Sequence, residues 1–140
     1  MILLGLLDFR AALHRLGVQE GFQWIDGSFL ENIEQLEGRA PRDIDVVTFV
    51  PSMASIPENE QAAELDHATL KTRFHVDAYF VETDELSAEL LVGISAYWYS
   101  VWSHRRTNLW KGYLQISLDP AEDQGVREQL NAEPPVSGMP

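Results

Sequence analysis

The most informative stretch of the chain is Asp43-Ile-Asp-Val-Val-Thr-Phe-Val50, which Pro51 ends. Its β-branched and aromatic residues are typical of a strand. The apolar residues alternate onto both faces, which predicts a central strand that is covered on both sides. Asp43 and Asp45 lie two positions apart, so their side chains are expected to project from the same face of this strand.

The rest of the sequence alternates between helical and extended patterns. Helices are expected at residues 6–16, 58–72 and 84–101, a helical turn at 29–36, and further strands at residues 22–25, 75–81 and 112–118. This order predicts an α/β domain (α+β in some schemes) over residues 1–119, in which helices flank a small mixed sheet of about four strands. Residues 120–140 are polar, and a flexible C-terminal tail is expected there.

The composition limits the classes of function. The chain has 140 residues, which suits one domain, and no cysteine, which excludes disulfides, thiolate zinc sites and a cysteine nucleophile. A net charge of −12 argues against long nucleic acid, which needs many Lys and Arg contacts, but allows one small phosphorylated ligand that arrives with metal ions. The apolar N-terminus lacks a basic start, and no apolar run reaches the ~18–20 residues of a membrane helix. We therefore expect a cytoplasmic protein that does not enter the membrane.

The pair Asp43 and Asp45 is the first candidate for chemistry. At ~3.3 Å per residue their backbones are roughly 6.6 Å apart, which allows two carboxylates to share a pair of divalent ions about 3.5–4 Å apart. Carboxylate oxygens favour Mg²⁺ or Mn²⁺ over Zn²⁺. The alternative is two aspartates at the solvated end of a strand, and an Asp-x-Asp taken alone favours that alternative.

Gly27 and Ser28 follow the first strand and suit a phosphate-binding turn. Glycine lets a phosphate approach the backbone, and free N–H groups and the serine hydroxyl can donate to its oxygens. Taken alone, the pair is only a turn. If the first two strands are antiparallel, however, the end of one lies beside the start of the other, and the phosphate-binding turn meets the carboxylate pair.

Asp77 is the third candidate, because it lies within the otherwise apolar strand at residues 75–81. Burying a carboxylate without a partner is costly. A metal ion shared with Asp43 and Asp45 would remove that cost. The alternatives are an exposed edge strand, or a salt bridge to an arginine; the candidates are Arg73, Arg105 and Arg106.

Three motifs, Trp-Ile-Asp-Gly-Ser-Phe (24–29), Asp-Ile-Asp-Val-Val (43–47) and Val-Asp-Ala-Tyr-Phe (76–80), together resemble the nucleotidyltransferase superfamily with its polymerase-beta-type palm. The chain looks most similar to small bacterial domains with this layout, and the resemblance covers residues 5–118. It implies that Gly27 and Ser28 hold a nucleoside triphosphate. It also implies that Asp43 and Asp45 bind both metal ions and that Asp77 completes the shell of the catalytic metal.

The sequence departs from this pattern in two respects. The stretch from Ser28 to Asp43 is somewhat long, so a loop must fold away from the site. A separate acceptor-binding domain, which many relatives have, is missing, so the acceptor stays open and the fold could have been kept without catalysis.

Two further features remain in the sequence. Arg105, Arg106 and Lys111 form a basic cluster that could contact the phosphates of the nucleotide, or could simply suit the negative end of a helix dipole.

The aromatic residues of segment 97–102 cannot all face one core, which favours an interface with a partner protein or a second copy. The alternative is that Trp110 and the last strand cover them. The aromatic residues are Tyr97, Trp98, Tyr99 and Trp102.

The leading hypothesis is a metal-dependent nucleotidyltransferase that moves a nucleoside monophosphate from a nucleoside triphosphate to a hydroxyl of a protein, a small molecule or an RNA end. By analogy with similar small bacterial proteins, a toxin–antitoxin or phage-defence setting is expected. One alternative is a non-catalytic binding module with this fold, such as an antitoxin or an assembly subunit. Another is a metal-dependent phosphodiesterase, which uses similar carboxylates but does not need the Gly-Ser turn.

Overall fold

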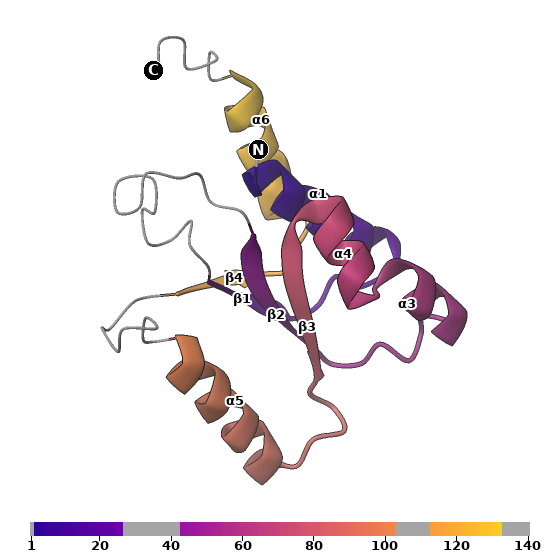
Figure 1. Ribbon diagram of the computed structural model, residues 1–140, viewed down its shortest axis with the longest axis vertical. Coiled ribbons are helices and arrows are strands. Elements are labelled where there is room, and N and C mark those ends of the chain that lie inside the picture. Colours follow the sequence, from indigo (N-terminus) through magenta and orange to yellow (C-terminus); the bar gives the residue numbers. More distant parts are fainter. Residues whose placement is uncertain (1, 27–42, 103–112, 133–140) are drawn as a thin grey trace.

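The computed structural model describes residues 2–26, 43–102 and 113–132, apart from the side chains of Ile2 and Trp102. Within these ranges the elements are α1 (Ile2–Arg15), β1 (Phe22–Asp26), β2 (Ile44–Val50), α3 (Glu58–Glu64), α4 (His67–Phe74), β3 (Val76–Glu82), α5 (Ala88–Trp102), β4 (Leu114–Ser117) and α6 (Ala121–Ala132). Figure 1 shows the sheet between α5 on one side and α1, α4 and α6 on the other. The predicted α/β class is therefore confirmed. No helix of the described part has the length and apolarity needed to cross a membrane.

The four strands form one mixed sheet in the order β3-β2-β1-β4. β2 pairs parallel with β3 and antiparallel with β1, and β1 pairs antiparallel with β4. Two clusters of apolar side chains cover β2. Val46 and Val50 pack into the larger one, to which α1 and α4 contribute, and Val47 and Phe49 pack into the smaller one with side chains of α5. β2 is thus the central strand, covered on both faces, that its sequence predicts.

The segment that the sequence predicts as one helix, residues 58–72, forms two helices that are separated at Leu65 and Asp66. Leu65 is buried, and Asp66 caps α4 by accepting a hydrogen bond from the Thr69 backbone N–H at 3.2 Å. At the other end, His75 adopts a left-handed conformation (φ 58°) and its N–H donates to the Lys71 carbonyl. Because of this break, α4 packs against β3 as a helix separate from α3.

The sequence did not predict a helix in the C-terminal segment, but residues 121–132 form helix α6. A buried network holds the start of this helix. Arg10 on α1 is 2% exposed, and its Nε–H donates to both carboxylate oxygens of Asp123 at 3.0 and 2.8 Å. The same guanidinium donates to Gln23 Oε1 at 2.8 Å and to the Ser117 carbonyl at 2.7 Å. These contacts join α1, β1, β4 and α6, and composition alone does not reveal them.

Gly21, which precedes β1, yields a prediction about stability. Its φ is +124°, and a Cβ at this position would lie 2.1 Å from the Phe49 carbonyl oxygen. Because Gly21→Ala adds both backbone strain and a clash with β2, we expect a loss of about 3 kcal/mol in the free energy of unfolding, measured with urea. Gly17→Ala is the matched control, since Gly17 also has a positive φ (+91°) but no atom within 4 Å of the added Cβ. It should cost only about 1–2 kcal/mol. Equal losses in the two variants would contradict the clash.

Candidate functional site

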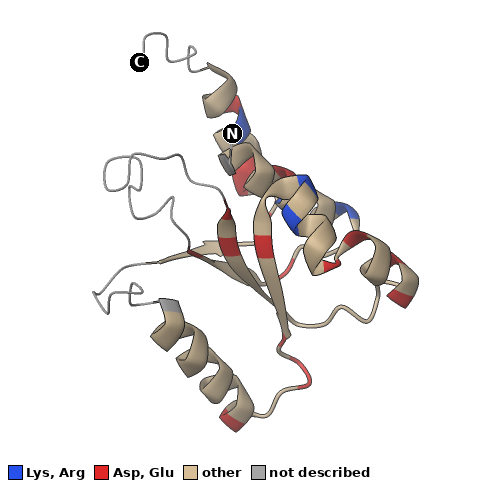
Figure 2. Ribbon diagram, in the orientation of Figure 1, with Lys and Arg blue, Asp and Glu red and all other residues tan. Residues whose placement is uncertain are grey.

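Three aspartates form one row across three neighbouring strands. Asp26 of β1 lies opposite Asp45 of β2, and Asp45 lies opposite Asp77 of β3. Opposed residues of paired strands project from the same face of a sheet, so all three carboxylates lie on the face that α5 covers. In Figure 2, acidic segments of β2 and β3 lie level with each other. We call Asp26, Asp45 and Asp77 the aspartate row.

Burial differs along the aspartate row. Asp26 is only 1% exposed, whereas Asp45 is half-buried and the Asp77 side chain is 19% exposed. The row is therefore deepest at β1 and opens toward β3, which is an edge strand of the described sheet. A ligand or a cation would reach Asp45 and Asp77 from this open end.

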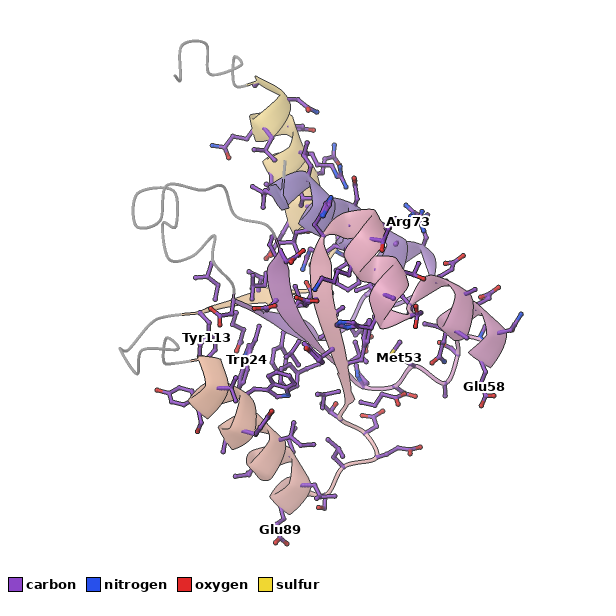
Figure 3. All side chains as sticks on the ribbon, in the orientation of Figure 1. Trp24, Met53, Glu58, Arg73, Glu89 and Tyr113 are labelled. Carbon is purple, nitrogen blue, oxygen red and sulfur yellow. The ribbon has the colours of Figure 1, made fainter. Side chains whose placement is uncertain are left out.

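The neighbouring positions on the same face become steadily more apolar. Beside the aspartate row lies the set Trp24, Val47 and Tyr79, and beyond it lie Phe22, Phe49 and Val81. α5 packs over this part through Trp98, whose ring lies 4.9 Å from the ring of Tyr79. Trp24 and Tyr113, both labelled in Figure 3, have ring centroids 5.2 Å apart. The apolar half of the face is thus covered, and the acidic half lies beside it.

The charge of Asp43, like those of Asp45 and Asp77, acts on Lys71. Asp43 lies one residue before β2 and is half-buried. A hydrogen bond to Asp77, then the charge of Asp77 and the charges of Asp43 and Asp45, raise the pKa of Lys71. The charges of all three carboxylates that the sequence predicts for the site therefore act on one lysine, and two of the three, Asp45 and Asp77, lie opposite each other in the sheet.

Lys71 and His67 of α4 approach Asp77 from the edge of β3. Lys71 Nζ lies 3.3 Å and His67 Nε2 lies 3.4 Å from the same oxygen, Asp77 Oδ1. The side chains of both residues are about half exposed, at 50% and 49%. A salt bridge is one of the alternatives that the sequence leaves open for Asp77. The structure forms it with Lys71, whereas the guanidinium of Arg73 stacks over the Phe74 ring at 4.9 Å.

Tyr79 borders the aspartate row on β3. Partial burial, followed by the charges of Asp77 and Asp45, raises the pKa of its hydroxyl. Its ring lies 5.6 Å from that of His67, whose Nδ1 is 3.3 Å from the Ala78 carbonyl oxygen. Two of the carboxylates of the aspartate row therefore act on the Tyr79 hydroxyl, and Lys71 opposes them.

Sequence reasoning did not identify Asp26, His67 or Lys71 as site residues. His67 and Lys71 are four positions apart, which puts both on one face of a helix, and this spacing is the available signal. Asp26 stands next to Gly27, but only the strand register shows that it lies opposite Asp45. His75, which shares the strand parity of Asp77 in the sequence, instead ends α4.

The candidate ligands of the site are the carboxylate oxygens of Asp43, Asp45 and Asp77. Oxygen ligands of this kind suit a hard divalent cation. The geometry is not that of an assembled metal centre. Among residues 2–26, 43–102 and 113–132, no group of three or more His, Cys, Asp or Glu side chains is placed to hold a metal ion. The ammonium of Lys71 contacts Asp77 Oδ1 at 3.3 Å.

The remaining predicted site residues lie outside the described part of the chain; they are Gly27, Ser28, Arg105, Arg106 and Lys111. The antiparallel pairing of the first two strands, which the prediction for the Gly-Ser turn requires, is formed as far as Asp26. The first two strands are antiparallel, and the last residue of β1 faces Asp45. Asp26 is the residue that precedes Gly27 and Ser28 in the sequence.

The aromatic residues of α5 divide between the core and the surface. Trp98 packs against the smaller apolar cluster, whereas Tyr97 and Tyr99 are 60% and 53% exposed. Tyr113, next to β4, meets the ring of Tyr99 edge-on at 5.9 Å, so the last strand covers part of this helix. The prediction that these rings do not share one core is confirmed, and the identity of a partner stays a prediction.

The chain belongs to the DUF6932 family, a family of unknown function, which it matches over residues 1–117. Comparison with curated proteins and with solved structures finds no match.

Proposed function

We propose that this DUF6932 protein is a metal-dependent nucleotidyltransferase that transfers a nucleoside monophosphate from a nucleoside triphosphate to an acceptor hydroxyl. The observation that carries the proposal is the register of the sheet. It aligns Asp26, Asp45 and Asp77 on one face, at the point where the chain continues into Gly27 and Ser28. A turn that can bind phosphate and a set of carboxylates that can bind Mg²⁺ then belong to one site.

In this proposal Asp43, Asp45 and Asp77 hold Mg²⁺ or Mn²⁺. The metal supplies positive charge that lowers the pKa of the acceptor hydroxyl and neutralises the leaving group. The acceptor hydroxyl gives up its proton to water and its oxygen bonds to the α-phosphorus, while the bond from that phosphorus to the bridging oxygen breaks and pyrophosphate leaves. Gly27 and Ser28 bind the triphosphate, and Arg105, Arg106 and Lys111 contact its phosphates; that basic set lies in one stretch of the sequence.

The acceptor in this proposal is a protein, a small molecule or an RNA end. The net charge of −12 disfavours long RNA, and the exposed Tyr97 and Tyr99 on α5 offer a surface for a partner protein or a second copy. A protein acceptor in a toxin–antitoxin or phage-defence setting in the cytoplasm is consistent with both features.

Thermal unfolding with each of the four ribonucleoside triphosphates, with and without Mg²⁺ or Mn²⁺, tests the proposal. A ligand that binds only the native state at a hundredfold excess over its Kd adds ~2.7 kcal/mol of stability. We expect the midpoint to rise only when metal and triphosphate are both present, and the best nucleotide then identifies the base. The matching nucleoside monophosphate is the control, because it lacks the β- and γ-phosphates that the Gly-Ser turn would bind. If none of the four triphosphates shifted the midpoint, the proposal would be rejected.

A non-catalytic binding module is the second candidate, and a specific observation favours it. Asp77 already has the ammonium of Lys71 as its counter-charge at 3.3 Å, so the strand does not need a metal to carry this carboxylate. A module of this kind should bind neither Mg²⁺ nor triphosphate. The same unfolding experiment therefore separates the two candidates.

A further inference from the structure

Within the described part of the chain, the ammonium of Lys71 faces the carboxylates of the candidate site from outside the sheet. Lys71 Nζ lies 3.3 Å from Asp77 Oδ1, and the charges of Asp43 and Asp45 also act on this lysine. Its placement follows from the fold. The break at Asp66 starts α4 as a separate helix, and α4 then runs along the edge strand β3 and presents Lys71 to Asp77.

We propose that the ammonium of Lys71 is a built-in counter-ion of the site, which a divalent metal ion must displace before it can bind Asp77. The inference rests on the proposed function and concerns the regulation of the same site. Lys71 is in this view a positioning residue, which holds Asp77 in the metal-free state and sets the metal concentration at which the site fills.

Competition follows from the shared oxygen. A metal ion of the Mg²⁺ type binds a carboxylate oxygen at ~2.0–2.1 Å. An ammonium that stayed 3.3 Å from Asp77 Oδ1 would then lie close to a second, doubly charged cation and would be repelled.

Displacement of the lysine is easy in this geometry. The Lys71 side chain is half exposed, so its long stem can turn the ammonium into water without opening the core. Its ammonium pairs with Asp77 at 3.3 Å, and an ion pair of this kind at the surface contributes little to stability. The lysine can thus hold the carboxylate in the absence of metal and yield to the metal when it arrives.

Titration of Mn²⁺ alone, followed by the loss of the free-ion EPR signal at low ionic strength, tests the inference. We expect Lys71→Met to bind Mn²⁺ on the order of fivefold more tightly than the unaltered protein, because the metal no longer competes with an ammonium. Lys71→Arg keeps the charge and should restore the original affinity. Lys71→Gln is a second neutral variant and should behave like Lys71→Met.

Arg73→Met is the matched control, since it removes one positive charge from the same helix without touching Asp77. Arg73 is labelled in Figure 3, and its guanidinium lies over the Phe74 ring at 4.9 Å. Its Mn²⁺ affinity should equal that of the unaltered protein. A general change in net charge would instead tighten binding in both Arg73→Met and Lys71→Met, and would overturn the assignment to Lys71.

The remaining outcomes separate this inference from the proposed function. Equal or weaker Mn²⁺ binding in folded Lys71→Met and Lys71→Gln would overturn the inference and leave the metal site intact. No Mn²⁺ binding by any of the proteins, the unaltered one included, would overturn the metal site of the proposed function and the inference with it. Circular dichroism of each variant shows whether it is folded.

Discussion

Replacement of Asp45 by alanine is expected to abolish metal-dependent binding of nucleoside triphosphate and to leave the fold intact. Asp45 is the central member of the aspartate row, because it lies opposite both Asp26 and Asp77. The substitution removes the carboxylate that lies between Asp26 and Asp77. We expect a fall in affinity of on the order of a hundredfold or more, since even second-sphere changes at metal sites cost about 10–100-fold. Asp43→Ala should have the same effect.

The measurement is the metal-dependent rise in the unfolding midpoint, recorded for Asp45→Ala beside the unaltered protein. Asp84→Ala is the matched control: it makes the same change of charge at an exposed position that follows the other end of β3. Its midpoint shift should be unchanged. If Asp45→Ala retained the shift, the site assignment would be wrong.

Replacement of Arg10 by methionine is expected to lower the free energy of unfolding by about 3–5 kcal/mol. Arg10 is 2% exposed and donates hydrogen bonds to Asp123, Gln23 and Ser117. Methionine fills part of the space but leaves the Asp123 carboxylate and two further acceptors without this donor, and such groups are costly to bury. Urea unfolding followed by circular dichroism measures the loss.

Arg127→Met provides the comparison for Arg10→Met. Arg127 pairs with Asp8 at 2.8 Å, but the two side chains are 35% and 56% exposed. A pair at the surface contributes about 0–1 kcal/mol, so this variant should be almost as stable as the unaltered protein. Similar losses in the two variants would show that the buried network does not hold α6 in place.

Much of the fold could be predicted from short stretches of sequence. The apolar run at residues 44–50 indicated a doubly covered strand, and β2 is central and packs into both apolar clusters. The first helix was predicted to end at residue 16, and α1 ends at Arg15, followed by Gly17 at a φ of +91°. These features depend on backbone periodicity and on residues with special backbone conformations, which are local properties.

The candidate site was predictable only in part. Residue spacing and the resemblance pointed to Asp43, Asp45 and Asp77, and the charges of all three act on Lys71, which contacts Asp77. No local pattern could show that Asp26 belongs to the row, because strand register depends on how two faces of a sheet bury their side chains. For the same reason the sequence did not identify Lys71, which reaches Asp77 only because α4 packs on β3.

The break between α3 and α4 and the presence of α6, neither of which the sequence predicted, have the same physical origin. The composition of residues 58–72 favours one helix, but burial of Leu65 and the cap at Asp66 divide it into α3 and α4. The composition of residues 121–132 favours a solvated tail, but the bond from Arg10 to Asp123 joins positions 113 residues apart and holds a helix there. Local spacing therefore determines which segments form strands and that Asp43 and Asp45 share a face. Contacts between residues distant in the sequence determine the register, the helix breaks and the cation at the site, because the free energy of burial depends on the whole fold.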